Sequence, residues 1–265
     1  MRNVIHLLTL LFFTIPNWTF GQATSDIIEE EIILIDSLIE AKNTKDASLL
    51  IDSLLNSLTI TKNDQWAKII HQKSQLLLGK KAFVDADTLL NQTIRYWEYN
   101  QDTLHLEYAS LLFTMGRCYY RYQGYGKALP YFKRSLDIQK KLPTSDQQLY
   151  ANTLNSLGIL NKELLGDYDQ AEAYYMESME VRKNYFGEKS LDYAKSLNNL
   201  GTLYSSIGKL EEAKKFLDQS IAIKKEIPNF DHESYAFSLM NLASLHQTTG
   251  SYQESEELYL EALDA

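Results

Sequence analysis

Side chains that could carry out catalysis are scattered along this sequence rather than gathered in a motif. The five histidines, at positions 6, 71, 105, 232 and 246, include no pair with the spacing of ligands in a zinc hydrolase. The single cysteine, Cys118, cannot form an intramolecular disulfide, and a thiolate metal site needs at least two such ligands. We expect Cys118 to be a small buried helix residue, with a reactive thiol beside Arg117 as the alternative. The sequence predicts no metal site, no cofactor and no catalytic residue.

Two shorter patterns also have ordinary structural explanations. The segment Gly124-Tyr125-Gly126 is half of a phosphate-binding loop, but such a loop follows a strand, and here the pattern falls between two helical segments. The acidic pairs Glu211-Glu212 and Glu256-Glu257 stand near the starts of helical segments, where negative charge suits the helix dipole. We interpret the first pattern as a turn and the acidic pairs as solvent-exposed helix faces.

The composition is typical of an all-helical protein. Among the 265 residues there are 41 Leu but only 3 Val, whereas a sheet core draws on β-branched residues. With 11 Gly and 4 Pro, turns are scarce. The formal net charge of -9 argues against a nucleic-acid partner, because binding to phosphates requires a basic surface.

The N-terminus is typical of a secretory signal peptide. A short positive start at 1–3 is followed by a mostly apolar run at 4–15, by Pro16, and by small residues for cleavage at 21–23. The run is shorter than the roughly 20 residues that span a bilayer. We expect residues 1–23 to be removed near Gly21 to Ala23, leaving an exported, periplasmic or secreted chain without a membrane span. The alternative is an N-terminal anchor helix.

An internal repeat organises the rest of the chain. Four matching blocks begin at Tyr108, Tyr150, Tyr193 and Tyr235, at intervals of 42, 43 and 42 residues. We expect the one extra residue to fall in the turn at 165–169. Each block contains two helical patterns, so the sequence predicts stacked helix hairpins. The expected organisation is a signal peptide at 1–23, a degenerate helical hairpin at 24–65, and an array at 66–265 with repeats at about 66–107, 108–149, 150–192, 193–234 and, incomplete, 235–265.

Small residues recur at one position of each first helix. They are Gly116, Gly158, Gly201 and Ala243. A glycine inside a helix costs about 1 kcal/mol relative to alanine, so its recurrence indicates that the second helix passes close by. We expect small partners on the second helix at Ala128, Ala171, Ala213 and Ser255. The large residues Phe132, Tyr175, Leu217 and Tyr259 are expected to fill the space beyond.

The segments 197–204 and 208–213 resemble a tetratricopeptide repeat (TPR), a helix–turn–helix of about 34 residues. The 42-residue period, with blocks opening Tyr-Ala-x-Ser/Thr-Leu, resembles the longer variant of kinesin light chains and of bacterial proteins with a CHAT peptidase domain. This resemblance covers about residues 66–265 well and 27–65 poorly. It implies an all-α fold, a right-handed α-solenoid of stacked TPR hairpins.

The resemblance also implies a concave groove lined by first helices, where an extended peptide or protein would bind. Carried over residue by residue, the groove candidates are Phe113, Arg117, Tyr120, Arg121, Asn152, Asn155, Lys162, Lys195, Asn198, Thr202, Met240 and Ser244, together with Ser110, Ile159, Ser205, Phe237 and Gln247. Asn155 and Asn198 are favoured because a carboxamide can donate to and accept from a peptide backbone. Four of the candidates are basic and would suit acidic side chains or a terminal carboxylate. The alternative is that all are ordinary exposed residues of amphipathic helices.

We therefore expect a non-catalytic interaction scaffold. The last helical pattern reaches residue 265 with an apolar face uncovered, which predicts the N-terminal part of a longer protein. The alternative function is the sensor or regulatory arm of a CHAT peptidase-like or signalling kinase enzyme, with the chain's own C-terminal effector domain as its partner.

Overall fold

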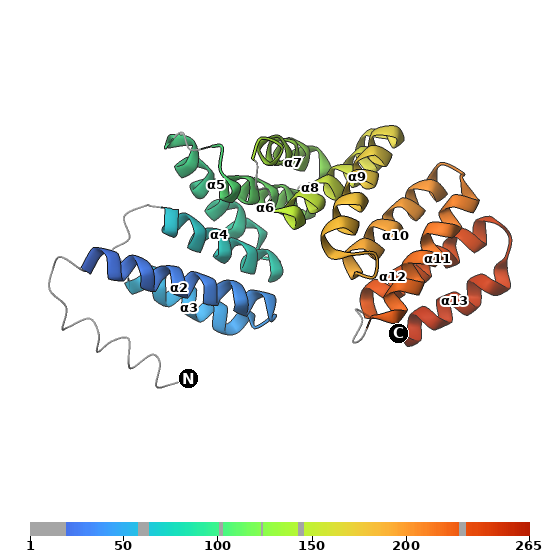
Figure 1. Ribbon diagram of the computed structural model, residues 1–265, viewed down its shortest axis with the longest axis horizontal. Helices are drawn as coiled ribbons and strands as arrows, with labels where there is room; N and C mark the ends of the chain where they lie inside the picture. Colours follow the sequence, from blue (N-terminus) through green and yellow to red (C-terminus); the bar gives the residue numbers. More distant parts are fainter. Residues whose placement is uncertain (1–19, 58–63, 101–102, 123, 143–145, 228–231) are drawn as a thin grey trace. The chain divides into compact units, whose positions relative to one another are not determined.

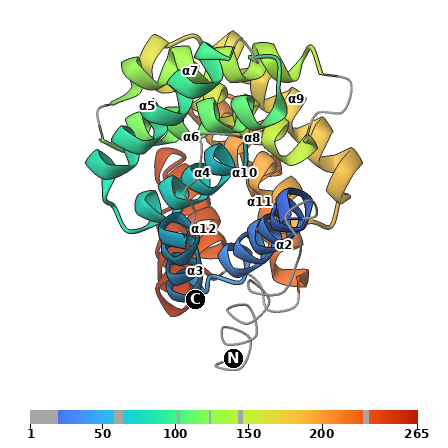
Figure 2. The ribbon, with the colours of Figure 1, turned by 90° about the vertical axis from the view of Figure 1, so that its left-hand side faces the viewer.

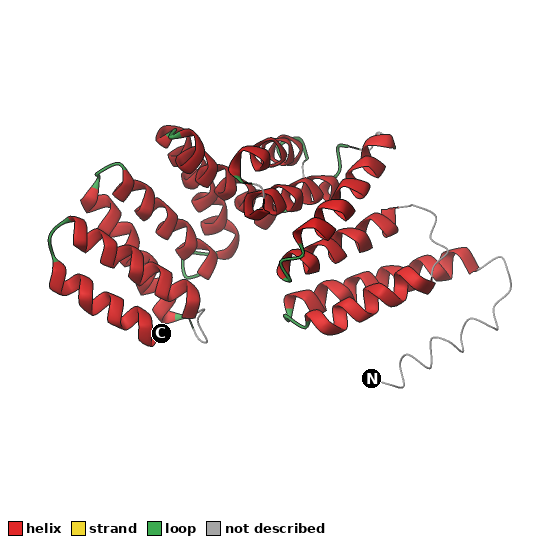
Figure 3. Ribbon diagram, turned by 180° about the vertical axis from the view of Figure 1, so that it is seen from behind, coloured by secondary structure: helices red, strands yellow, loops and turns green. Residues whose placement is uncertain are grey.

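The computed structural model describes residues 20–57, 64–100, 103–122, 124–142, 146–227 and 232–265. These segments are almost entirely helical and contain no strand (Figure 3). The predicted all-α class is therefore confirmed. The apolar run assigned to a signal peptide lies outside the described residues up to position 19, and the expected cleavage positions 21–23 lie in the first turn of a helix.

Twelve α-helices and one π-helical turn make up the described chain (Figure 1). In order they are α2 (Phe20–Glu40), α3 (Thr44–Ser57), α4 (Asp64–Gly79), α5 (Phe83–Tyr99), α6 (Leu106–Tyr122), α7 (Tyr125–Gln139), α8 (Gln147–Leu160), η1 (Asn161–Leu165), α9 (Tyr168–Phe186), α10 (Leu191–Ser206), α11 (Leu210–Glu226), α12 (His232–Thr248) and α13 (Tyr252–Asp264). They form two compact units, 1–102 and 103–265.

The first unit contains the hairpins α2–α3 and α4–α5. Its core includes Ile35, Ile51 and Ile69, which are fully buried. Gln72 of α4 ties the hairpins together, because its Nε2 donates to the carbonyl oxygen of Ile32 at 3.2 Å and to Asp36 Oδ1 at 2.7 Å. The hairpin α4–α5, which the repeat register groups with the later array, thus packs with the N-terminal hairpin in one unit.

The second unit stacks four hairpins, and each helix packs on the helices before and after it. The first helices α6, α8, α10 and α12 follow one another along one side of this unit, and the second helices follow along the other (Figures 1 and 2). In three of the hairpins a buried serine at the equivalent repeat position joins the two helices. Ser135, Ser178 and Ser220 donate to the carbonyl oxygens of Ala109, Ala151 and Ala194 at 2.6, 2.9 and 2.7 Å. This is the predicted solenoid of helix–turn–helix repeats.

The recurrent glycines mark close contacts, as expected, and the nearest atoms belong to the large residues of the second helices. A methyl group on Gly116 or Gly158 would lie 2.7 or 2.5 Å from a ring atom of Phe132 or Tyr175. One on Gly201 would lie 2.7 Å from Leu217 Cγ and 3.2 Å from the carbonyl oxygen of Ala213. The large side chains therefore lie directly on the glycines, in space that a Cβ atom would otherwise occupy.

The extra residue of the second block lies in the first helix, not in the turn. The turn glycine Gly166 stands 8 residues after Gly158, whereas in the next block Gly208 stands 7 residues after Gly201. From the turn glycine to the alanine of the second helix the interval is 5 residues in both blocks. The turn at 165–169 is thus not lengthened. The π-helical turn Asn161–Leu165 absorbs the residue, and Gly166 ends it with a left-handed φ of 64°. Widening one helical turn keeps both flanking helices in register.

Replacing Gly201 by alanine should destabilise the second unit. The new methyl group would displace Leu217 and press on a backbone oxygen, which costs more than the roughly 1 kcal/mol gained in helix propensity. We expect a net loss of about 1 to 2 kcal/mol, measured as a lower urea midpoint by circular dichroism. The control is Gly126→Ala in α7, where nothing lies within 4 Å of the added methyl group. Equal midpoints for the two variants would contradict this packing.

Candidate functional site

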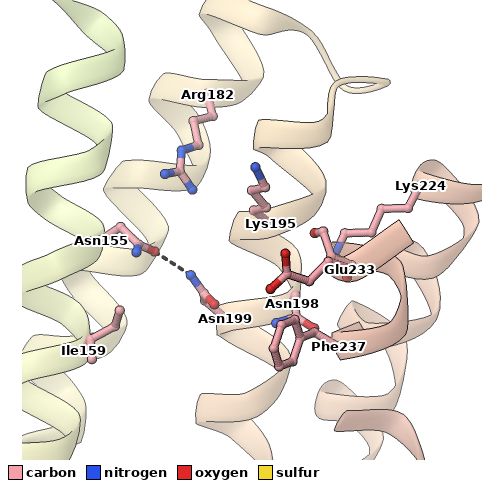
Figure 4. A pocket seen from close by; sticks show the side chains of 10 residues that line it. Asn155, Ile159, Arg182, Lys195, Asn198, Asn199, Lys224, Glu233 and Phe237 are labelled. Atoms are coloured by element: carbon pink, nitrogen blue, oxygen red, sulfur yellow. Dashed lines mark hydrogen bonds between the residues drawn. The ribbon is translucent and has the colours of Figure 1, made fainter. Parts of the chain in front are cut away.

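A pocket of about 360 Å³ opens on the second unit between the first helices α8, α10 and α12 (Figure 4). It is lined by Asn155, Ile159, Arg182, Lys195, Asn198, Asn199, Lys224, Glu233, Ser234 and Phe237. Three of these side chains are cationic and one is acidic. The pocket is therefore a predominantly basic site within a chain whose formal net charge is -9.

Each of the three first helices presents residues one turn apart. Asn155 and Ile159 come from α8, Lys195 and Asn199 from α10, and Glu233 with Phe237 from α12. Side chains four positions apart share one face of a helix, so parallel stacking of the first helices brings the pairs together. Ser190 positions the start of α10, because its side chain accepts from the backbone N–H of Tyr193.

Two buried cations from second helices also line the pocket. Arg182 of α9 donates to Ser196 Oγ at 2.9 Å and to Asn152 Oδ1 at 2.8 Å. Lys224 of α11 donates to the carbonyl oxygen of Ser234 and to Ser238 Oγ, both at 2.7 Å. Burial lowers the pKa of Arg182 from its ordinary value, and nearby Asp192 opposes the shift. These oxygens hold the two charges at the base of the pocket, and no carboxylate of the described segments hydrogen-bonds to Arg182.

The two cations occupy equivalent positions of successive repeats. Gln139 stands 43 residues before Arg182, and Lys224 stands 42 after it. Gln139 donates in the same way to Thr153 Oγ1 of the next first helix at 3.0 Å. One buried polar side chain per hairpin thus joins it to the next hairpin, and we call these three residues the polar links.

Asparagines connect the first helices to one another. Asn199 Nδ2 donates to Asn155 Oδ1 at 2.5 Å, and Asn241 Nδ2 donates to Asn198 Oδ1 at 3.0 Å. Ser238 Oγ also donates to Asn198 Oδ1, at 2.9 Å. The oxygens of Asn155 and Asn198 are occupied, whereas their Nδ2 groups make no hydrogen bond within the described segments. Both asparagines can therefore donate to a ligand, and Asn198 Oδ1, which already accepts two hydrogen bonds, has no lone pair left to accept another.

Opposite charges face the pocket from neighbouring first helices. Lys195 and Glu233 form no hydrogen bond or ion pair with any residue that the structure describes, including each other. The Glu233 carboxylate lies beside Phe237 and Asn198, and the Lys195 side chain lies beyond it, toward Arg182 (Figure 4). Phe237 is 55% exposed. The pocket therefore offers a cation, an anion and an aromatic face to a ligand.

The structure brings only some of the predicted groove residues to this pocket. Asn155, Lys195 and Asn198 line it, as do Ile159 and Phe237. The candidates that do not line it are Ser110, Phe113, Arg117, Tyr120, Arg121, Asn152, Lys162, Thr202, Ser205, Met240, Ser244 and Gln247.

Several of these other candidates contact neighbours on their own hairpin. Arg117 lies over the Phe113 ring at 6.0 Å, and Lys162 pairs with Glu163 at 3.1 Å. Tyr120 stacks on Tyr125, and burial raises its pKa to about 12. Of the four basic candidates, only Lys195 lines the pocket.

Sequence reasoning missed Arg182, Lys224, Asn199, Glu233 and Ser234. The first two carried a signal in the repeat register, because a long polar residue recurs on the otherwise apolar inner face of the second helices. Asn199 stands next to the predicted position 198, and helix rotation decides that both face the pocket. Glu233 and Ser234 stand four and three residues before Phe237, about one turn earlier on α12 than any predicted position.

The chain matches family models in two places. A tetratricopeptide repeat model matches residues 149–226, and a second one matches residues 238–265. No curated protein sequence matches the chain. Within the described residues, no helix is long and apolar enough to cross a membrane, and no group of three metal-ligating side chains occurs.

Solved structures with the same fold share little sequence with the chain. BtubC (BKLC) from P. vanneervenii is 20% identical, with 89% of this chain and 90% of that chain covered and a TM-score of 0.63. The TPR-like repeats of a kinesin light chain from P. anserina are 19% identical, with coverage of 77% and 96% and a TM-score of 0.62. NprR in complex with its cognate peptide NprX is 16% identical, with coverage of 99% and 71% and a TM-score of 0.68.

Truncating a polar link should weaken the stacking of hairpins. Arg182→Ala removes two hydrogen bonds and leaves a cavity, so we expect a loss of roughly 2 to 4 kcal/mol in unfolding free energy, measured by urea titration. Arg182→Gln introduces the residue found at the equivalent position 139 and should lose less than half as much. A glutamine variant as unstable as the alanine variant would refute the equivalence of these links.

Proposed function

We propose that the chain, which matches tetratricopeptide repeat models over residues 149–226 and 238–265 and shares the fold of kinesin light chain repeats, is a non-catalytic scaffold that binds an extended peptide or protein segment. The binding surface is the first-helix side of residues 103–265. The pocket between α8, α10 and α12 is its anchor point.

One observation carries this proposal: three hydrogen-bond donors that line the pocket have no protein acceptor within the described segments. Lys195 Nζ and the Nδ2 groups of Asn155 and Asn198 have no partner within the described ranges, and Arg182 and Lys224 add positive charge at the base. Donors of this kind suit a carboxylate, from an acidic side chain or from a chain terminus. The exposed Phe237 ring supplies apolar contact beside them.

The fold is compatible with this role. NprR, which shares the fold, has been solved in complex with a peptide. Stacked helix hairpins present an extended side to their partners, so several repeats can contact one segment. In this chain the pocket draws on three consecutive hairpins, and a ligand there would contact all three.

We also propose that the chain is exported and that its first 21 to 23 residues are a cleaved signal peptide. The short positive start, apolar run and small residues before position 24 support export. Expression of the chain with its own N-terminus in a Gram-negative host should yield periplasmic protein whose N-terminal sequencing begins at Gln22 or Thr24. Recovery of uncleaved cytoplasmic protein would contradict export.

Peptide selection tests the binding function. A random dodecapeptide phage library selected on the chain should enrich peptides that contain acidic residues, and fluorescence anisotropy should give a Kd in the micromolar range. Lys195→Glu should weaken these peptides at least tenfold, because it places a carboxylate against the ligand's own.

Two further variants make the test specific. Lys215→Glu reverses an exposed charge on α11 outside the pocket and should change the Kd less than twofold. Arg117→Glu alters a first-helix residue outside the pocket and reports whether the ligand extends to α6. Failure to enrich any peptide, or equal Kd values for the wild type and Lys195→Glu, would overturn the proposed function.

A further inference from the structure

We propose that the pocket recognises a peptide segment in which an acidic and a basic side chain stand close together, the acid at Lys195 and the base at Glu233. This inference rests on the proposed function and names the ligand chemistry of the same site. It starts from the two opposite charges that face one pocket and are not paired with each other.

The acidic side chain of the ligand would bind near α10. Lys195 supplies the charge, and the Nδ2 groups of Asn155 and Asn198 are the neighbouring donors. Arg182 and Lys224 lie at the base of the pocket with their hydrogen bonds directed to oxygens of the protein. They therefore raise the local potential without needing to contact the ligand.

The basic side chain of the ligand would bind against α12. Glu233 and Phe237 are four positions apart and face the pocket together, as Figure 4 shows. A lysine or arginine from the ligand can pair with the Glu233 carboxylate while it lies against the Phe237 ring, and a cation over an aromatic face gains about 0.5 to 1 kcal/mol at an exposed site. A site for acids alone would gain nothing from Glu233, because its charge would repel the ligand.

The two places belong to adjacent first helices, so the ligand's charges must be neighbours in its sequence. Lys195 and Glu233 are too far apart in the structure to form an ion pair, and each lies at the open pocket. A ligand that inserts one charge toward each would complete both pairs at once. The arrangement also fixes direction, because the acid must point toward α10 and the base toward α12.

Affinity measurements on selected peptides test this ligand chemistry. Peptides enriched on the wild-type chain should carry an acidic and a basic residue within three positions of each other. Glu233→Gln should weaken them about fivefold or more, and replacing the peptide's basic residue by glutamine should abolish the difference between wild type and Glu233→Gln. Glu256→Gln on α13 makes the same charge change away from the pocket and should leave the Kd within twofold.

A charge exchange tests direction. The double variant Lys195→Glu with Glu233→Lys should bind the original peptides at least tenfold more weakly, and should bind peptides with the acidic and basic residues exchanged better than the wild type does. Glu233 is exposed and makes no side-chain hydrogen bond or ion pair within the described residues, so these variants should keep the wild-type circular dichroism spectrum.

The outcomes separate this inference from the proposed function. Equal or tighter binding by Glu233→Gln, or enriched peptides that carry acids without a neighbouring base, would overturn the paired-charge ligand while peptide binding at Lys195 stands. Loss of all peptide enrichment would instead overturn both.

Discussion

The contact of one large second-helix side chain with a small residue of its own first helix is the interaction on which the rest of this structure depends. Phe132, Tyr175 and Leu217 lie on Gly116, Gly158 and Gly201. A glycine inside a helix costs about 1 kcal/mol, but burying a large apolar side chain contributes about 1.5 to 3 kcal/mol. The gain from burial exceeds the cost of the glycine, so the contact stabilises the hairpin and sets how closely its two helices approach. The first helices α6, α8 and α10 therefore present their remaining faces in the same orientation, and the pocket is built on this face of α8 and α10 together with α12.

The polar links carry this order from one hairpin to the next and also give the site its charge. Gln139, Arg182 and Lys224 occupy equivalent positions, and each reaches a hydroxyl of the following first helix. A buried cation is costly unless hydrogen bonds replace its hydration, and the serine, asparagine and carbonyl oxygens provide them. Stacking requires only a long donor at this position. A cation can therefore replace the neutral glutamine at this position without altering the fold, and Arg182 and Lys224 make the electrostatic potential of the pocket positive.

The register of the array tolerates local irregularity because the hairpins interact mainly with their neighbours. The extra residue of the second block is confined to the π-helical turn Asn161–Leu165, and Gly158 and Ala171 on either side keep their places in the core. The division of the chain into two compact units falls between α5 and α6, at a connection where the repeat pattern itself continues. The boundary between the two compact units therefore cannot be read from the repeat period of the sequence.

The sequence by itself determined the helices, the hairpins, the repeat and the recurrent glycines, because these follow from periodic apolar spacing and from local backbone cost. It also indicated five residues of the site, Asn155, Ile159, Lys195, Asn198 and Phe237. Only the tertiary structure decided where the extra residue is accommodated, since interval counting gives the length of a block but not the helix that widens. It alone showed that the asparagine oxygens are occupied by neighbouring helices and that Arg182, Lys224 and Glu233 share a pocket with Lys195. These facts depend on helix rotation and on contacts between residues about 40 positions apart, which no local pattern encodes.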